Sequence, residues 1–354
     1  MKWEDNVRRV VPYVPGEQPK RKDIIKLNTN ECPYAPAPAI AKVLSEYTTA
    51  DLRLYPDPNV SGLVKSIADT YGVKPENVFV GVGSDDVLAM AFLTFFNSGK
   101  KILFPDITYS FYDVWADLYK IPYEVQPLDE NFCLRKEDYC KENGGIIFPN
   151  PNAPTGIEES LENIEEIIQK NQDVVVIVDE AYVDFGCKSV LPLIHKYDNL
   201  LVVQTFSKSR ALAGIRIGYA FGSERLIQYL NDVKFSFNSY TINRLTEVVG
   251  CTCLEDKAYF KETVQKVVNT RERVKQRLSK LGFSFGDSKA NFIFASHKSV
   301  PAKEIFEALK EEGIYVRHFN KPRIDNYLRI SIGTDEEMNT MLAFLEGYLQ
   351  KREG

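Results

Sequence analysis

The chain has 354 residues, which is long enough to bury a large core and to form two domains. Its net charge of −5 gives no support for nucleic-acid binding, and no apolar run approaches the roughly 18 residues that a transmembrane helix needs. Six scattered cysteines lack the pattern of a zinc site, and the N-terminus does not resemble a signal peptide. We therefore expect a cytoplasmic protein with reduced thiols and no bound metal.

The order of the apolar runs predicts an α/β protein. Residues 1–40 are rich in proline and predict an N-terminal arm that belongs to the smaller domain. Residues 41–245 alternate strand and helix patterns, which predicts a large three-layer α/β/α domain with a mostly parallel central sheet. Residues 246–354 begin with a long helix at 257–281 and predict a smaller α+β domain. The expected strands are 78–82, 101–105, 123–126, 146–148, 174–178, 200–206 and 218–222 in the larger domain, and 291–295, 314–317 and 328–332 in the smaller one.

The first strand expected in the larger domain ends in a glycine-containing turn before a helix. Gly81, Gly83 and Ser84 form this turn. Glycine lets the backbone approach a phosphate closely, and the N-terminus of the next helix offers free N–H groups. The segment matches neither a Rossmann fingerprint nor a Walker loop, so by itself it is a weak indication of a phosphate site.

The strand expected at 146–148 runs into Pro-Asn-Pro-Asn-Ala-Pro-Thr-Gly at 149–156. Three prolines and a glycine exclude a continuing helix or a central strand, so this segment is predicted to be a rigid turn. Apolar residues at 161, 164, 167 and 168 then predict an amphipathic helix over 161–170. The turn alone is also compatible with a purely structural loop.

The strand expected at 174–178 leads directly into Asp179, and Tyr182 follows. A carboxylate at the carboxyl end of a buried strand occupies the place where open α/β sheets bind ligands. The alternative is an aspartate that caps the following helix.

Lys208 follows the apolar run 200–206, and hydroxyl residues surround it. A poorly solvated lysine holds a neutral amine at lower cost, and a neutral amine can form a Schiff base with an aldehyde. Thr205, Ser207 and Arg216 could bind a phosphate beside it. A lysine next to a phosphate site indicates pyridoxal 5′-phosphate (PLP); the alternative is a surface lysine at a strand end. Asp179 could then keep the pyridine nitrogen protonated, as the ring requires to act as an electron sink.

In their order along the chain, these segments resemble the class I/II aminotransferases, which are PLP enzymes of fold type I. The resemblance spans nearly the whole chain. It implies that Lys208 carries the cofactor and the reacting proton, that Asp179 pairs with the pyridine nitrogen, and that Tyr182 contacts the phenolate oxygen. The further cofactor contacts that it implies are ring stacking by Tyr109 and phosphate binding by Gly83, Ser84, Thr205, Ser207 and Arg216.

One position departs from that family. The family often has an asparagine immediately before Pro-Thr-Gly, where it contacts the phenolate oxygen. Here Ala153 stands at that position, with Asn152 just before it. We assign the contact to Asn152, which requires a shift in the turn; otherwise Tyr182 makes the contact alone.

Four further segments resemble the branch of the family whose amine donor is L-histidinol phosphate. They are residues 11–16, Leu-Asn-Thr-Asn-Glu-Cys-Pro at 27–33, Arg-Leu-Tyr-Pro-Asp-Pro at 53–58 and Leu-Arg-Ile-Ser-Ile-Gly at 328–333. The resemblance implies that Tyr55 reaches the cofactor phosphate of the partner subunit, so the chain is expected to form a homodimer with shared sites. The substrate contacts that it implies are Tyr13, Asn30, Arg317 and Arg329.

The reaction implied is transfer of the amino group of L-histidinol phosphate to 2-oxoglutarate, which yields imidazole-acetol phosphate and glutamate in histidine biosynthesis. Arg317 and Arg329 could instead be surface ion-pair partners, and His318 is expected to be solvated rather than catalytic. An aromatic-amino-acid aminotransferase or a threonine-phosphate decarboxylase on the same scaffold remains open. A PLP-sensing regulator is disfavoured, since the chain has no basic DNA-binding extension.

Overall fold

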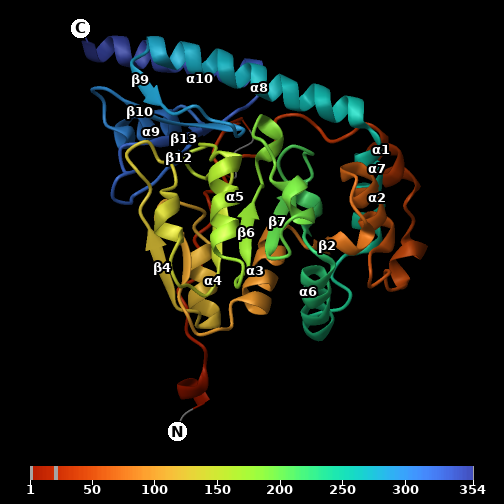
Figure 1. The fold of residues 1–354 in the computed structure, drawn as a ribbon. Helices are drawn as coiled ribbons and strands as arrows, with labels where there is room; N and C mark the ends of the chain where they lie inside the picture. Colours follow the sequence, from red (N-terminus) through yellow and green to blue (C-terminus); the bar gives the residue numbers. More distant parts are fainter. Residues whose placement is uncertain (1–2, 20–22, 354) are drawn as a thin grey trace.

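The computed structural model describes residues 3–19 and 23–353 (Figure 1). What was predicted for residues 1–2, 20–22 and 354 lies outside this part of the chain. A seven-stranded sheet forms the centre, in the order β2-β8-β7-β6-β5-β3-β4. β8 is antiparallel to β2 and β7, and the other neighbouring strands are parallel. The strands are β2 (Val78–Gly81), β3 (Ile102–Pro105), β4 (Tyr123–Gln126), β5 (Ile146–Pro149), β6 (Val176–Asp179), β7 (Leu200–Thr205) and β8 (Gly218–Phe221).

The predicted three-layer fold with a mostly parallel sheet is confirmed, and the ends of these seven strands lie within two residues of the prediction. Successive side chains of the central strands point to opposite faces of the sheet. Ile146 and Phe148 of β5 enter one hydrophobic cluster, whereas Ile147 enters another. Both clusters are buried, which explains why these strands are continuous apolar runs in the sequence.

Helices cover both faces of the sheet (Figure 1). One layer contains α3, α4 and α6, and the other contains α1, α2, α5 and α7. The helix predicted at 161–170 forms as α5, where the Ser160 hydroxyl accepts a hydrogen bond from the Asn163 N–H and caps the first turn. The bounds are α1 (Ala39–Glu46), α2 (Ser61–Tyr71), α3 (Ser84–Phe95), α4 (Tyr112–Tyr119), α5 (Leu161–Lys170), α6 (Glu224–Phe237) and α7 (Arg244–Glu255).

The C-terminal part packs over the end of the sheet at which the parallel strands finish (Figure 1). Two long helices, α8 and α10, lie side by side there. An antiparallel sheet has the order β12-β13-β10-β9, and β1 pairs with β11 in parallel. The bounds are β1 (Ile25–Lys26), α8 (Lys257–Lys280), β9 (Phe283–Phe285), β10 (Phe292–His297), α9 (Ala302–Glu311), β11 (Ile314–Tyr315), β12 (Arg317–His318), β13 (Leu328–Ser331) and α10 (Asp335–Glu353).

The strand predicted at 314–317 forms as two short strands in different sheets, β11 with β1 and β12 with β13. The domain limits at residues 40 and 245 remain a prediction.

In the described residues, no helix combines the length and the apolar character that crossing a bilayer requires. Short 3-10 helices are η1 (Trp3–Asn6), η2 (Thr49–Arg53), η3 (Pro75–Asn77), η4 (Lys136–Tyr139), η5 (Val183–Phe185), η6 (Leu191–His195) and η7 (Ala213–Ile215).

Candidate active site

A pocket of about 170 Å³ lies at the carboxyl ends of β5, β6 and β7. Asp179 is the last residue of β6, and its register partner Pro149 is the last residue of β5. Lys208 follows shortly after the end of β7. Because parallel strands bring their carboxyl ends to one edge, residues far apart in the sequence meet there. The predicted cofactor residues that line this pocket are Ser84, Tyr109, Asp179, Tyr182, Ser207, Lys208 and Arg216.

Asp179 is an almost fully buried carboxylate, 5% exposed. Its Oδ1 accepts a hydrogen bond from the Ala181 N–H at 3.2 Å, and its Oδ2 accepts one from the Tyr112 hydroxyl at 3.0 Å. Burial raises the pKa of Asp179 to about 6, because the charged form loses its hydration. A cationic group in the pocket would therefore be strongly favoured beside it.

Lys208 is half-buried and faces the same pocket. Its Nζ donates a hydrogen bond to the carbonyl oxygen of Thr29 at 3.4 Å and lies 5.5 Å from the ring centroid of Tyr182. The primary amine, the phenol and the Asp179 carboxyl thus line one small volume. A free amine in such a place can attack an aldehyde and can carry a proton.

Gly83 lies next to the pocket residues Ser84 and Arg216. Its φ of +87° is left-handed, and a Cβ there would lie 2.3 Å from Nη2 of Arg216. Ser84 starts α3, so the first N–H groups of that helix face the region around the Arg216 guanidinium. Thr205 lies behind Ser207, and its Oγ1 accepts a hydrogen bond from the Ser207 N–H at 3.1 Å. Together, the guanidinium, the helix N–H groups and the hydroxyls are donors of the kind that bind a phosphate.

Asn152 and Asn30 are buried side chains outside the lining of the pocket. The Asn152 amide donates to the carbonyl oxygen of Ile107 at 3.0 Å and to the Thr155 hydroxyl at 2.9 Å, while Ala153 lines the pocket. Asn30 donates to the Tyr182 hydroxyl at 3.0 Å. Asn152, which was predicted to contact the phenolate oxygen of the cofactor, therefore does not line the pocket, while Asn30 orients the Tyr182 hydroxyl.

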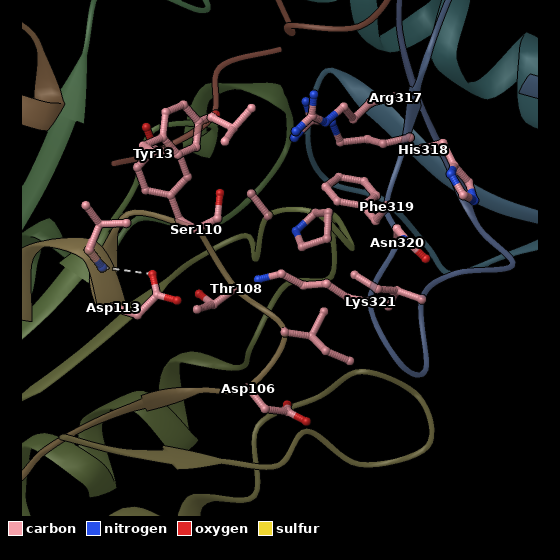
Figure 2. Close-up of a pocket in the computed structure, with 18 of the residues that line it drawn as sticks. Tyr13, Asp106, Thr108, Ser110, Asp113, Arg317, His318, Phe319, Asn320 and Lys321 are labelled. Atoms are coloured by element: carbon pink, nitrogen blue, oxygen red, sulfur yellow. Dashed lines mark hydrogen bonds between the residues drawn. The ribbon is translucent and has the colours of Figure 1, made fainter. Parts of the chain in front are cut away.

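A larger cavity of about 820 Å³ adjoins the first, and Tyr109 and Ala153 line both. Three of the predicted substrate residues line this cavity, and Figure 2 shows two of them. Tyr13, from the N-terminal arm, stacks on Phe111 with ring centroids 4.1 Å apart. The predicted substrate residues that line it are Tyr13, Arg317 and Arg329.

Arg317 of β12 and Arg329 of β13 are register partners on neighbouring antiparallel strands. Neither forms an ion pair with a carboxylate in residues 3–19 or 23–353, so the surface ion-pair alternative is not what the structure shows. Arg329 donates to the carbonyl oxygen of Asn28 at 3.0 Å, and its buried Nε has no partner in that part of the chain. Burial lowers the pKa of Arg329, and the charge of Arg317 adds to this effect. Two unpaired guanidinium groups in one cavity favour an oxyanion ligand.

The loop between β12 and β13 contributes residues that the sequence patterns did not single out. Lys321 extends into the cavity toward Thr108, whereas His318 points away from it (Figure 2). The His318 Nε2 lies 2.7 Å from the carbonyl oxygen of Asp325, and the side chain is half-buried. Lys321 could have been predicted from the basic segment Asn-Lys-Pro-Arg at 320–323, which lies between Arg317 and Arg329 in the sequence.

Tyr55 lies on the surface of the chain and is absent from the lining of both cavities. Its side chain is 79% exposed, and its ring lies 4.7 Å from that of Tyr240. Leu52, close by in the sequence, is 70% exposed, and exposed apolar side chains that form one patch indicate a protein contact. The contact predicted for Tyr55 is with a partner subunit, and a single chain does not test it.

PLP fits this site. The cradle that a Cβ at Gly83 would fill suits a phosphate, Lys208 suits the aldehyde, and Asp179 suits the ring nitrogen. The fold and the site thus define a PLP enzyme of fold type I. The profile of the family "aminotransferase class I and II" matches residues 22–345. The chain belongs to the class I and II aminotransferases, and its cofactor is PLP.

Known proteins are similar to this chain over 92–100% of its length. The histidinol-phosphate aminotransferase of Lactococcus lactis subsp. lactis is 53% identical over 354 residues, covering 100% of this chain and 98% of the relative. Among solved structures, the histidinol-phosphate aminotransferase of Clostridium acetobutylicum has a TM-score of 0.86 at 24% identity, covering 93% of this chain and 100% of the other. That of Sinorhizobium meliloti, solved with pyridoxal 5′-phosphate, has a TM-score of 0.85 at 22% identity, covering 92% and 91%.

Proposed function

We propose that this aminotransferase transfers the amino group of L-histidinol phosphate to 2-oxoglutarate and so produces imidazole-acetol phosphate and glutamate. The observation that carries the proposal is the pair of unpaired arginines, Arg317 and Arg329, in a cavity that opens beside Lys208 and Asp179. The relative from Lactococcus lactis, which bears the name of this activity, supports it.

The proposed cofactor-binding site consists mainly of the residues that line the smaller pocket. When bound, PLP supplies an aldehyde that takes up the amino group and a ring that accepts electrons from Cα. Asp179 would hold the proton of the ring nitrogen, and Tyr109 would stack on the ring. Tyr182, oriented by Asn30, would donate to the phenolate oxygen. The phosphate would lie among Gly83, Ser84, Thr205, Ser207 and Arg216.

Lys208 is proposed to move the reacting proton. Its Nζ lies at the mouth of the pocket beside Tyr182, held by the Thr29 carbonyl oxygen. From there the free amine would take the proton from Cα of the donor and release it at the aldehyde carbon of the cofactor. The same amine would carry the proton in the opposite direction when 2-oxoglutarate takes up the amino group.

The arginines are proposed to bind the far end of both substrates. The phosphate of the donor and the distal carboxylate of 2-oxoglutarate are both oxyanions that a guanidinium fork can bind in two hydrogen bonds. Arg329 has its Nε free for this, and Arg317 lies next to it across the sheet. Tyr13 would close the cavity from the N-terminal arm.

We further propose a homodimer in which Tyr55 contacts the cofactor phosphate of the partner's site. The exposure of Tyr55 and of its neighbours Leu52 and Tyr240 supports a protein contact there. A cytoplasmic location is part of the same proposal. The free state of all six cysteines, which suits a reducing compartment, supports it.

The proposed function is tested by adding L-histidinol phosphate, without a keto acid, to the purified holoenzyme. We expect stoichiometric loss of the visible absorption of the bound cofactor and its return on addition of 2-oxoglutarate. L-Histidinol, which lacks the phosphate, is the control and should act only at much higher concentration. A holoenzyme that does not respond would contradict this donor, and release of carbon dioxide from threonine phosphate would indicate a decarboxylase instead.

A further inference from the structure

Tyr112, the first residue of α4, lies behind the Asp179 carboxyl. Its side chain is fully buried, and its hydroxyl donates a hydrogen bond to Asp179 Oδ2 at 3.0 Å. The Ala181 N–H donates to Oδ1 at 3.2 Å. Each oxygen of Asp179 therefore receives one donor, which fixes the plane of the carboxyl group as well as its position.

The ring of Tyr112 is already held by other aromatic residues. It lies 6.0 Å from the ring of Phe104, 6.3 Å from that of Phe92 and 6.3 Å from that of Trp115. A phenylalanine would fill this space equally well. A buried hydroxyl costs free energy unless it is hydrogen-bonded, so the hydroxyl of Tyr112 has a use only through its bond to Asp179.

The environment of Asp179 makes that bond important. Burial disfavours the carboxylate, and the negative charge of Asp85 disfavours it further, while the charge of Lys208 opposes both effects. The hydroxyl of Tyr109, three residues before Tyr112, donates to Asp85 instead, at 2.7 Å. Only an ionised Asp179 can hold a protonated ring nitrogen, and each donor to its oxygens favours the ionised form.

We propose that Tyr112 is a positioning residue that keeps Asp179 ionised and oriented toward the ring nitrogen of the cofactor. This inference rests on the proposed cofactor contact of Asp179. Tyr112 does not line the pocket, so it acts only through the carboxyl group. Its removal should weaken cofactor binding and shift the absorption of the bound cofactor without opening a cavity in the core.

The test is the dissociation constant of PLP for Tyr112→Phe, measured by equilibrium dialysis against the PLP-free protein. We expect about tenfold weaker binding, the usual scale for loss of a hydrogen bond to a charged group, together with a shifted absorption maximum of the bound cofactor. Tyr139→Phe is the matched control. Tyr139 is also a buried tyrosine, but its hydroxyl has no partner in the described part of the chain, so PLP binding should be unchanged.

A double-mutant cycle with Asp179→Asn separates positioning from packing. If Tyr112 acts through the carboxylate, Tyr112→Phe should have no further effect on PLP binding once Asp179 is replaced. An equal effect in both backgrounds would overturn the inference, as would an effect no larger than that of Tyr139→Phe. If Asp179→Asn weakens binding and Tyr112→Phe does not, the inference alone fails. If Asp179→Asn leaves binding unchanged, the proposed contact of Asp179 fails, and the inference fails with it.

Discussion

Gly83 and Arg216 lie against each other beside the smaller pocket, where we propose that the cofactor phosphate binds, although 133 positions of sequence separate them (216 − 83). The absence of a side chain at Gly83 is what lets the guanidinium lie against the start of α3. Arg216 itself has a left-handed φ of 61°. This backbone conformation is uncommon for a residue other than glycine, and Arg216 adopts it at the end of η7.

Gly83→Ala should displace Arg216, because the new Cβ would lie 2.3 Å from Nη2. We expect PLP binding to weaken by about ten- to a hundredfold, the scale of a charge-assisted contact. Gly72→Ala is the control, since Gly72 has a similar φ of +71° and open space around its Cβ position. Gly72→Ala should lower the free energy of unfolding by roughly 1 kcal/mol through backbone strain, and it should bind PLP normally. Equal PLP affinities for the two variants would contradict the prediction that a Cβ at Gly83 disturbs Arg216.

Arg329 and its neighbour Arg317 both lack a carboxylate partner among the described residues. Placing two guanidinium groups on adjacent strands without a carboxylate is unfavourable, and burial lowers the pKa of Arg329. If these arginines only stabilised the fold, we would expect each guanidinium to be paired with a carboxylate of the same chain. The unpaired state is expected where a substrate supplies the missing anion, which is the physical reason for assigning the larger cavity to the oxyanion ends of both substrates.

At the level of elements, the loop between β12 and β13 is joined to the large domain by apolar packing and by the polar contacts of Arg323. Ile324 of the loop packs in one cluster with Ile107 and Leu128. Arg323 forms an ion pair with Asp106, just after β3, at 2.7 Å. It also donates to the carbonyl oxygens of Leu128 and Asp129, at 2.8 and 2.9 Å. The loop that carries Lys321 into the larger cavity thus bridges the C-terminal sheet and the central sheet.

Arg323→Ala should loosen this loop and raise KM for both the amine donor and 2-oxoglutarate by about tenfold, because three hydrogen bonds are lost. The affinity for PLP should not change, since the loop does not line the smaller pocket. Steady-state kinetics and PLP titration measure the two effects separately. Arg135→Ala removes a surface ion pair with Asp138 and should change neither. A change in PLP affinity alone would argue against the loop as a part of the substrate cavity.

At the level of the whole molecule, a buried polar network joins β7, β8 and the residue that follows β6 to α2. Glu180 accepts hydrogen bonds from the Val190 N–H and from Gln204, at 2.6 and 2.8 Å. Gln204 accepts one from Tyr219 at 2.9 Å, and the Tyr219 and Tyr71 hydroxyls lie 2.6 Å apart. Burial raises the pKa of Glu180 to about 7, although these donors favour its ionised form.

Folding stability should therefore depend on pH through Glu180. Its pKa is raised from 4.5 to about 7 in the folded protein, so the folded state binds the proton more tightly than the unfolded state. Stability should fall as pH rises from about 4.5 to 7, by up to about 3 kcal/mol. The free energy of unfolding, measured with urea at saturating PLP between pH 5 and 8, should change less with pH for Glu180→Gln than for the wild type. Glu224→Gln, on the exposed first turn of α6, should leave the dependence unchanged. A Glu180→Gln slope equal to that of the wild type would contradict this origin.

The proposed dimer makes a prediction that only a mixture of chains can test. Tyr55→Phe should weaken PLP binding, and Lys208→Ala should abolish turnover. If Tyr55 acts in the partner's site, a heterodimer of the two variants has one complete site, built from Lys208 of one chain and Tyr55 of the other. Its activity should reach about half that of the wild type. Mixtures no more active than the sum of the separate variants would exclude shared sites.

The larger part of the fold could be predicted because its signals are local. Buried parallel strands are short apolar runs, and β4 and α5 have the predicted bounds. The split of the segment at 314–317 could not be predicted, since β11 and β12 differ in their pairing partners rather than in their own residues.

The chemistry of the chain could be inferred from the sequence alone: the order of Asp179, Lys208 and Arg216 after apolar runs indicated PLP, and parallel strands must end at one edge. Which side chains surround Asp179, Lys208 and Arg216 became clear from the folded arrangement. Tyr112 lies behind Asp179, Asn30 behind Tyr182 and Lys321 in the larger cavity, and Asn152 lies outside the smaller pocket. The physical reason is that apolar periodicity shows which face of an element is buried, whereas hydrogen bonds between residues distant in sequence depend on which elements pack together.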